Sequence, residues 1–194
     1  MSVTEFDALI NSLLALYPKE TNCRMYNLLD SHDTARFLFE CGGDKKLLKL
    51  AVAFQMAYPG CPAIFYGDEI GLSGENDPGC RLAMEWAEDR QDAELYKWYQ
   101  QLIKIRLSFR TLTSGDYRTV VCDDAANVYC FSRSLGEEKT LIFMNASANE
   151  WNRTAPCPAW ATHTTEITLD RSDRDIQSSS RTDKAFLTDN QTSM

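Results

Sequence analysis

A histidine and an aspartate stand side by side at positions 32 and 33, directly after a short apolar run, in the stretch NLLDSHDTARF (residues 27–37). An imidazole and a carboxylate together can carry out general acid–base chemistry, bind a metal ion or hydrogen-bond the hydroxyls of a sugar. The spacing is equally compatible with a structural role, in which Asp33 caps a turn or helix and His32 is its hydrogen-bonded partner. The pair by itself leaves these alternatives open.

The rest of the sequence disfavours several kinds of chemistry for this pair. The chain has 2 histidines, and the second, His163, lies in a distant β-rich region, so we expect no metal site. Ser31, His32 and Asp33 cannot form a proton relay if they continue a strand, because neighbouring side chains of a strand point to opposite faces. We find no phosphate-binding loop, dinucleotide fingerprint or G-x-S-x-G motif, and we expect no cofactor.

Two further polar clusters follow later in the chain. The segment YGDE (residues 66–69) ends a second apolar run. Its acids could be catalytic, but we favour a role in anchoring a loop. The segment NDPGCR (residues 76–81) lies in a long polar loop. There, Asp77 and Arg81 could brace the loop as an ion pair, or they could clamp the hydroxyls of a ligand.

The elements that must position these clusters alternate between helices and short apolar strands. A capping box at Ser2 and Glu5 predicts a first helix that ends at Tyr17-Pro18. Asp44 is expected to cap a second helix, and a third should run from about 92 to 108. The apolar runs at 25–29 and 63–66 predict strands of a parallel sheet that is buried on both faces. This order predicts an α/β fold with the polar clusters at the carboxyl ends of the strands, where α/β barrels carry their chemistry.

The pattern changes after residue 111. Short apolar segments at 117–122, 128–132, 140–144 and 165–169 predict an antiparallel all-β module. Polar residues dominate from position 171 onward, and we expect a loosely ordered tail there. The predicted domains are therefore 1–110, 111–170 and 171–194.

Composition and charge argue against several partners. The net charge is −8 and no basic stripe is visible, which argues against nucleic-acid binding. The longest apolar stretch, 47–58, is interrupted by Lys49 and Gln55 and is too short to cross a membrane. The 7 cysteines contain no C-x-x-C motif, and the first residues contain no basic leader. We therefore expect free thiols and a cytoplasmic protein.

Taken in order, these motifs resemble the C-terminal part of glycoside hydrolase family 13, the α-amylase superfamily, in its neopullulanase, cyclomaltodextrinase and maltogenic amylase branch. NLLDSHDTARF resembles the motif after the seventh barrel strand, and GCPAIFYGDEIG (60–71) resembles that of the eighth. NDPGCRLAMEW (76–86) resembles a substrate-binding loop, and the segment 95–117 resembles the last barrel helix with its passage into domain C. The resemblance implies the last two strands and flanking helices of a (β/α)8 TIM barrel, followed by an antiparallel β-sandwich (domain C) that lacks its usual closing strand.

The resemblance also implies roles for individual residues. Asp33 would be the third catalytic carboxylate and would accept hydrogen bonds from sugar hydroxyls near an oxocarbenium-like transition state. His32 would hydrogen-bond the same sugar, and Asp77 and Arg81 would hold a glucose unit further from the cleaved bond. Arg36 keeps a structural interpretation. The implied ligand is an α-glucan, a maltooligosaccharide or a cyclodextrin.

One departure from the family pattern concerns the chemistry itself. Members are retaining glycosidases, whose carboxylate nucleophile and acid/base follow strands four and five, and we find no counterpart of either residue in this sequence. We therefore expect the isolated chain to be inactive, and a non-catalytic sugar-binding or structural remnant is the alternative. A separate chain that completes the barrel is a third possibility. Two parallel strands with open edges also predict self-association.

Overall fold

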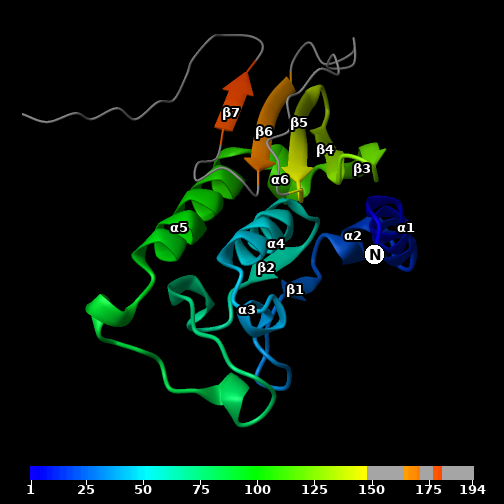
Figure 1. The fold of residues 1–194 in the computed structure, drawn as a ribbon. Coiled ribbons are helices and arrows are strands. Elements are labelled where there is room, and N and C mark those ends of the chain that lie inside the picture. The colour runs from blue at the N-terminus through cyan, green and yellow to red at the C-terminus, as the bar shows by residue number, and fades with distance from the viewer. Residues whose placement is uncertain (148–163, 171–176, 181–194) are drawn as a thin grey trace, which may run out of the picture.

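A computed structural model describes residues 1–147, 164–170 and 177–180 of the chain. Most helices surround a short two-stranded sheet, and a larger five-stranded sheet lies at the opposite end of the molecule (Figure 1). The helices are α1 (Val3–Ala15), α2 (Lys19–Asn22), α3 (Phe37–Glu40), α4 (Lys45–Ala57), α5 (Ala93–Ser108) and α6 (Arg110–Ser114), with short 3-10 turns η1 (Asp68–Ile70), η2 (Gly79–Arg81) and η3 (Glu88–Arg90). The strands are β1 (Tyr26–Leu28), β2 (Cys61–Ala63), β3 (Asp116–Asp123), β4 (Val128–Leu135), β5 (Glu138–Asn145), β6 (Thr164–Asp170) and β7 (Gln177–Ser180).

The first two of the three long helices begin at the capping residues that the sequence indicates. At the start of α1, Ser2 Oγ accepts from the Glu5 backbone N–H at 3.1 Å, and Glu5 Oε2 accepts from the Ser2 N–H at 2.8 Å, which confirms the capping box. Asp44 and Asp92 cap α4 and α5 by accepting hydrogen bonds from first-turn backbone N–H groups. None of the helices in the described part of the chain is long and apolar enough to cross a membrane.

The main hydrophobic core lies between α4, α5 and one face of the five-stranded sheet. The expected stripe on α5 is buried, with Leu95 completely inaccessible and Tyr99 and Leu102 each 3% exposed. Residues from both helices and from three strands share this core: Leu48, Val52, Met56, Leu95, Trp98, Leu102, Phe131, Ile142, Ile167 and Leu169. The helices are therefore fixed to the sheet, and they in turn carry the loops that follow β1 and β2.

Strands β1 and β2 form the predicted parallel pair, with Asn27 opposite Pro62. Two details differ from expectation. Strand β2 begins at Cys61, ahead of the apolar run at 63–66, and the strands are not buried on both faces, since Tyr26 is 73% and Leu28 46% exposed. The reason is that the described residues supply no third strand to this sheet, so its outer edges and one face remain open.

The β-module forms a single five-stranded sheet in the order β3-β4-β5-β6-β7. Strands β3, β4 and β5 are antiparallel as expected, but β6 runs parallel to β5. A parallel neighbour is possible because the connection after β5 is long enough for a crossover rather than a hairpin. Strand β7 pairs with β6 inside the segment for which we expect a loosely ordered tail. The described residues therefore show one sheet, not the two layers of a sandwich.

Two buried arginines connect the carboxyl end of α4 to the elements behind it. Arg106 of α5 donates to the Met56 carbonyl near the end of α4, and Arg133 of β4 donates to the carbonyls of Ala57 and Gly115, the latter at 2.9 Å. The final carbonyls of a helix lack partners within the helix and carry partial negative charge, so they suit cations. Burial, reinforced by the nearby Arg106 charge, lowers the pKa of Arg133 to about 10.

Candidate functional site

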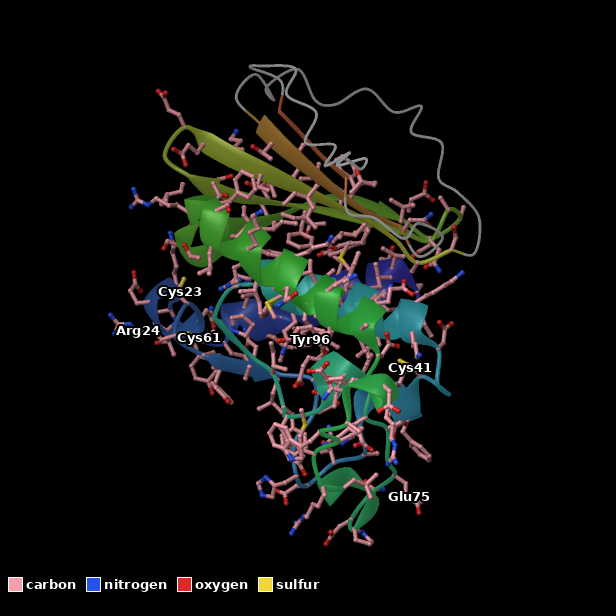
Figure 2. All side chains as sticks on the ribbon, turned by 90° about the vertical axis from the view of Figure 1, so that its left-hand side faces the viewer. Cys23, Arg24, Cys41, Cys61, Glu75 and Tyr96 are labelled. Carbon is pink, nitrogen blue, oxygen red and sulfur yellow. The ribbon has the colours of Figure 1, made fainter. Side chains whose placement is uncertain are left out.

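The loops that follow β1 and β2 meet at one end of the molecule because the two strands are parallel. His32 and Asp33 lie in the loop after β1, while Asp77 and Arg81 lie in the long loop between β2 and α5. Both loops occupy the lower end of the ribbon in Figure 1, away from the five-stranded sheet. Glu75, which belongs to the second loop, marks the same end in Figure 2.

Arg81 lies at the centre of the four residues that the sequence singles out. Its Nε donates to the His32 carbonyl oxygen at 2.9 Å and lies 3.3 Å from Asp77 Oδ1. Its Nη2 lies 3.4 Å from Asp33 Oδ1. One guanidinium thus joins the two loops and brings His32, Asp33 and Asp77 together.

His32 and Asp33 contact each other directly, with 3.2 Å between Nε2 and Oδ1. This contact is possible because both residues lie in a turn, so the alternation of side chains that we expect for a continued strand does not apply. Within the turn, the Asp33 backbone N–H donates to Ser31 Oγ at 3.1 Å, and this oxygen lies 3.2 Å from Thr34 Oγ1. The Ser31 hydroxyl therefore stabilises the turn.

The four side chains are open to solvent. Their exposed fractions range from 48% for Arg81 to 69% for Asp33. Ion pairs at such exposure contribute at most about 1 kcal/mol each. Contacts within these pairs can therefore be replaced by contacts to a ligand at little cost in free energy. The cluster offers carboxylate acceptors and guanidinium and imidazole donors on one surface, which is the set that a polyhydroxylated ligand requires. The Asp77–Arg81 pair fits both the bracing and the clamping interpretation.

Main-chain contacts hold the two loops against each other. The Ala35 N–H donates to Asn76 Oδ1 at 3.1 Å, and the Arg36 N–H donates to the Gly74 carbonyl at 2.9 Å. Gly74 is required at this crossing, because a Cβ there would lie 2.1 Å from the Gly79 carbonyl oxygen. These contacts fix the relative position of the turn at His32 and the segment that leads to Arg81.

A buried charged cluster lies beneath the exposed residues. The Arg36 guanidinium is completely inaccessible and pairs with Asp68, with 2.7 Å between Nη1 and Oδ1. Arg36 is thus a structural residue, and Asp68 anchors the loop that follows β2. Both observations agree with the roles that we expect from the sequence. The sequence reasoning missed Asp30, which is 4% exposed and also belongs to this cluster. The signal in the sequence was the position of this acid at the end of an apolar run, which indicates a buried side chain. A buried acid normally needs a partner.

Within the described residues, no group of three or more histidine, cysteine, aspartate or glutamate side chains is arranged to hold a metal ion. His163 lies outside the described residues. Cys23, Cys61, Cys80 and Cys122 are free thiols. Figure 2 shows Cys23, Cys41 and Cys61 above the lower end of the molecule where Glu75 lies.

Comparison with known families gives one match, "Alpha amylase, catalytic domain", over residues 1–88. The chain is 43% identical over 147 residues to a cyclomaltodextrinase of Geobacillus thermopakistaniensis and 44% identical over 140 residues to neopullulanase 2 of Thermoactinomyces vulgaris. It is 41% identical over 137 residues to the intracellular maltogenic amylase of Bacillus subtilis. These alignments cover 70–76% of this chain but only 23–25% of the relatives. The chain thus spans about a quarter of the length of the curated relatives that it matches.

Solved structures give a consistent comparison. The ligand-free cyclic α-maltosyl-(1→6)-maltose hydrolase of Arthrobacter globiformis superposes with a TM-score of 0.76 at 29% identity, over 93% of this chain and 38% of that protein. A cyclomaltodextrinase superposes with a TM-score of 0.65 at 43% identity, over 69% of this chain and 23% of that protein. These neighbours support a partial TIM-barrel-type fold for the first part of the chain.

Proposed function

The chain belongs to the α-amylase family, and from that premise we propose that it forms part of the sugar-binding cleft of an α-glucan-degrading glycoside hydrolase. The observation that carries the proposal is the cluster around Arg81, which gathers His32, Asp33 and Asp77 beyond the carboxyl ends of two parallel strands. Active sites of barrel enzymes are built at this end of the strands.

Each residue has a proposed role. Asp33 accepts hydrogen bonds from two hydroxyls of the sugar at the cleavage point and stabilises the positive charge that develops there. His32 donates to the same sugar. The Asp77–Arg81 pair holds a neighbouring glucose unit, with the carboxylate accepting from hydroxyls and the guanidinium donating to them. No metal or cofactor enters these roles.

The proposed ligands are maltooligosaccharides, cyclodextrins and related α-glucans, in keeping with the names of the relatives. The reaction of the whole enzyme would be hydrolysis of a glycosidic bond with retention, for which Asp33 supplies one of three carboxylates. We propose that this chain alone is inactive. A non-catalytic maltooligosaccharide-binding or structural remnant is the alternative, and the binding measurement below separates the two.

We further propose that residues 1–110 form the barrel-type part, that 111–170 form at least one sheet of domain C, and that 171–194 form a polar extension. The division is supported by the order of the elements, since α1 to α5 precede the first long strand, β3. A cytoplasmic location is proposed from the likeness to an intracellular amylase and from the free thiols.

The binding proposal predicts weak but specific affinity for maltoheptaose. Part of a cleft lacks most of the contacts and preorganisation of a complete one, so we expect a dissociation constant of about 1 mM or weaker. The Asp33→Asn variant should bind at least about tenfold more weakly, because hydrogen bonds to a charged acceptor contribute about 1.5–3 kcal/mol. Amide chemical shifts in a nuclear magnetic resonance titration would measure both constants.

Two controls sharpen this measurement. Asp89→Asn removes another carboxylate from the exposed turn η3 and should leave the affinity unchanged. A β-linked glucan of equal length should cause no comparable shifts. Micromolar binding by the original chain would favour the binding-module alternative, whereas an affinity that Asp33→Asn leaves untouched would contradict the proposed site.

Self-association is the second expectation for the isolated chain. A second copy is the proposed partner, because β1 has an open edge in the described structure. Apolar side chains are exposed on β1 and on the helix α1: Leu9, Leu13, Leu16, Tyr26 and Leu28. Sedimentation velocity should show a mean mass that rises with concentration, and Leu13→Glu should shift the chain toward monomer.

Leu107→Glu is the matched control for that experiment. Leu107 is 75% exposed on α5, whereas Leu13 is 45% exposed on α1. The control should therefore leave the association unchanged. A single monomeric species at every concentration would contradict the proposal.

A further inference from the structure

The main-chain carbonyl of His32 accepts two hydrogen bonds from the loop that follows β2. Arg81 Nε donates to this oxygen at 2.9 Å, and Cys80 Sγ donates to it at 3.2 Å. A carbonyl oxygen has two lone pairs, so these two donors saturate it as an acceptor. The contact uses only the backbone of His32, and the imidazole remains in contact with the Asp33 carboxylate.

The two donors are consecutive residues of the short turn η2, but their surroundings differ. Cys80 is completely inaccessible to solvent, whereas the Arg81 side chain is 48% exposed. The turn itself is closed by a hydrogen bond from the Arg81 backbone N–H to the Pro78 carbonyl at 3.0 Å. One buried and one half-exposed side chain of the same turn thus hold a single oxygen atom of the other loop.

This contact holds a different part of the loop from the main-chain crossing described above. The backbone N–H groups of Ala35 and Arg36 donate to Asn76 and Gly74, and they fix the residues that follow the turn. The His32 carbonyl lies within the turn itself, three residues before Ala35. The position of the turn relative to η2 therefore depends on the bonds that this carbonyl accepts.

The donors of the Arg81 guanidinium are divided between two tasks. Nε carries a single hydrogen, and the His32 carbonyl takes it. The Nη atoms carry the remaining hydrogens, and the contact from Nη2 to Asp33 Oδ1 is long, at 3.4 Å. One edge of the guanidinium is therefore committed to the protein backbone, while the other faces a carboxylate that a ligand can replace.

We propose that the His32 carbonyl, held by Arg81 Nε and Cys80 Sγ, is the anchor that positions the turn bearing His32 and Asp33. Arg81 is then a positioning residue through Nε, whatever its Nη atoms bind. Without the Nε donor, the turn is held to η2 by the thiol alone, which is a weak donor, and it moves away from η2. The inference concerns the arrangement of the two loops and does not depend on sugar binding.

Two neutral variants of Arg81 separate the Nε donor from the positive charge. The side-chain nitrogen of glutamine is bonded to Cδ, as Nε of arginine is, so Arg81→Gln keeps an N–H donor at the same distance from the backbone. Arg81→Met places a methyl group there instead. Both variants remove the charge that faces Asp33 and Asp77. The position is half-exposed, so we expect both variants to fold.

Nuclear magnetic resonance spectra of the full chain test the proposal. The reporters are the carbonyl carbon of His32, whose chemical shift responds to the hydrogen bonds it accepts, and the backbone amides of residues 31–35. Arg81→Gln should keep these signals close to those of the parent chain, whereas Arg81→Met should displace them. The amide signals of β4 and β5 confirm that each variant is folded. Equal displacement in both variants would overturn the proposal, because Arg81 would then act through its charge, and so would no displacement in either.

Two further measurements test each donor separately. Cys80→Ala should displace the His32 carbonyl signal in the same direction as Arg81→Met but by less, and Cys122→Ala, which removes an exposed thiol from β3, should leave it in place. In the parent chain, the Arg81 Nε–H should exchange with water more slowly than that of Arg90, whose side chain is 71% exposed. Equal exchange rates of these two protons would overturn the proposal without the use of any variant.

Discussion

The purified 194-residue chain should release no glucose or maltose from maltotriose or from β-cyclodextrin. Retaining hydrolysis needs a nucleophile and an acid/base about 5–5.5 Å apart, and Asp33 provides neither in the proposed assignment. Loss of a general acid alone costs about 10²–10⁴-fold in rate, and loss of the nucleophile removes the covalent route as well. We therefore expect a rate at least about 10⁴-fold below that of a complete relative.

The carboxylates near Asp33 do not offer a substitute pair. Asp77 is engaged by Arg81, while Asp30 and Asp68 are buried beneath the loop. Chromatographic analysis of the products over several days would set the detection limit, with a complete cyclomaltodextrinase as the positive control. The Asp33→Asn variant, purified in parallel, reports contaminating amylase. Sugar release that exceeds this background would contradict the prediction.

Complementation by a separate chain predicts a different result in the same assay. The 194-residue chain would remain inactive alone and become active only when mixed with a protein that supplies the missing carboxylates. Such activity should disappear when Asp33→Asn replaces the parent chain in the mixture. Equal activity of the mixtures that contain the parent chain and Asp33→Asn would show that the second protein acts without this site.

Arg36→Met should lower the free energy of unfolding by about 3–5 kcal/mol at pH 8. Methionine fills most of the space against Phe65 and Tyr66, so the loss reports mainly the charge. Removal of one member of a buried ion pair leaves the other without compensation, and here the buried Asp68 carboxyl would lose the guanidinium that it pairs with. Urea unfolding followed by circular dichroism would give this free energy.

Arg90→Met is the matched control for this experiment. Arg90 pairs with Glu85 at 3.4 Å, but its side chain is 71% exposed. Such a surface pair contributes at most about 1 kcal/mol, so the control should unfold almost like the parent chain. If Arg36→Met costs less than about 1 kcal/mol, the buried pair provides no net stability and the loop is held mainly by its backbone hydrogen bonds.

Local signals predicted most of the individual elements. Ser2 with Glu5 and Asp44 each identified the first turn of a helix correctly, because a cap acts on backbone N–H groups only two or three residues away. Strands β3 to β6 were likewise found within a few residues of their bounds, whereas β7 was missed. The order of the motifs was sufficient to indicate the α-amylase family, which the comparisons then support.

Pairings between distant segments were predicted less well. The sequence indicates strand β6 but not its parallel pairing with β5, because the direction of pairing depends on the path of a long connection. The prediction that β1 and β2 are buried on both faces was wrong for the described residues. Burial of a strand depends on neighbouring strands, and the described residues add no third strand to this sheet. The candidate residues around Arg81 were singled out from their motifs, whereas their individual roles were implied by the resemblance and stay predictions.

By itself, the sequence determined which residues begin helices, which segments can form strands and which polar residues follow the strands. Only the tertiary structure decided that Arg81 joins His32, Asp33 and Asp77, and that Arg36 pairs with Asp68 beneath them. The physical reason is the range of the interactions. Caps and periodicity act within one or two turns of chain, whereas charge clusters arise between residues that meet only after the parallel strands and the core have formed.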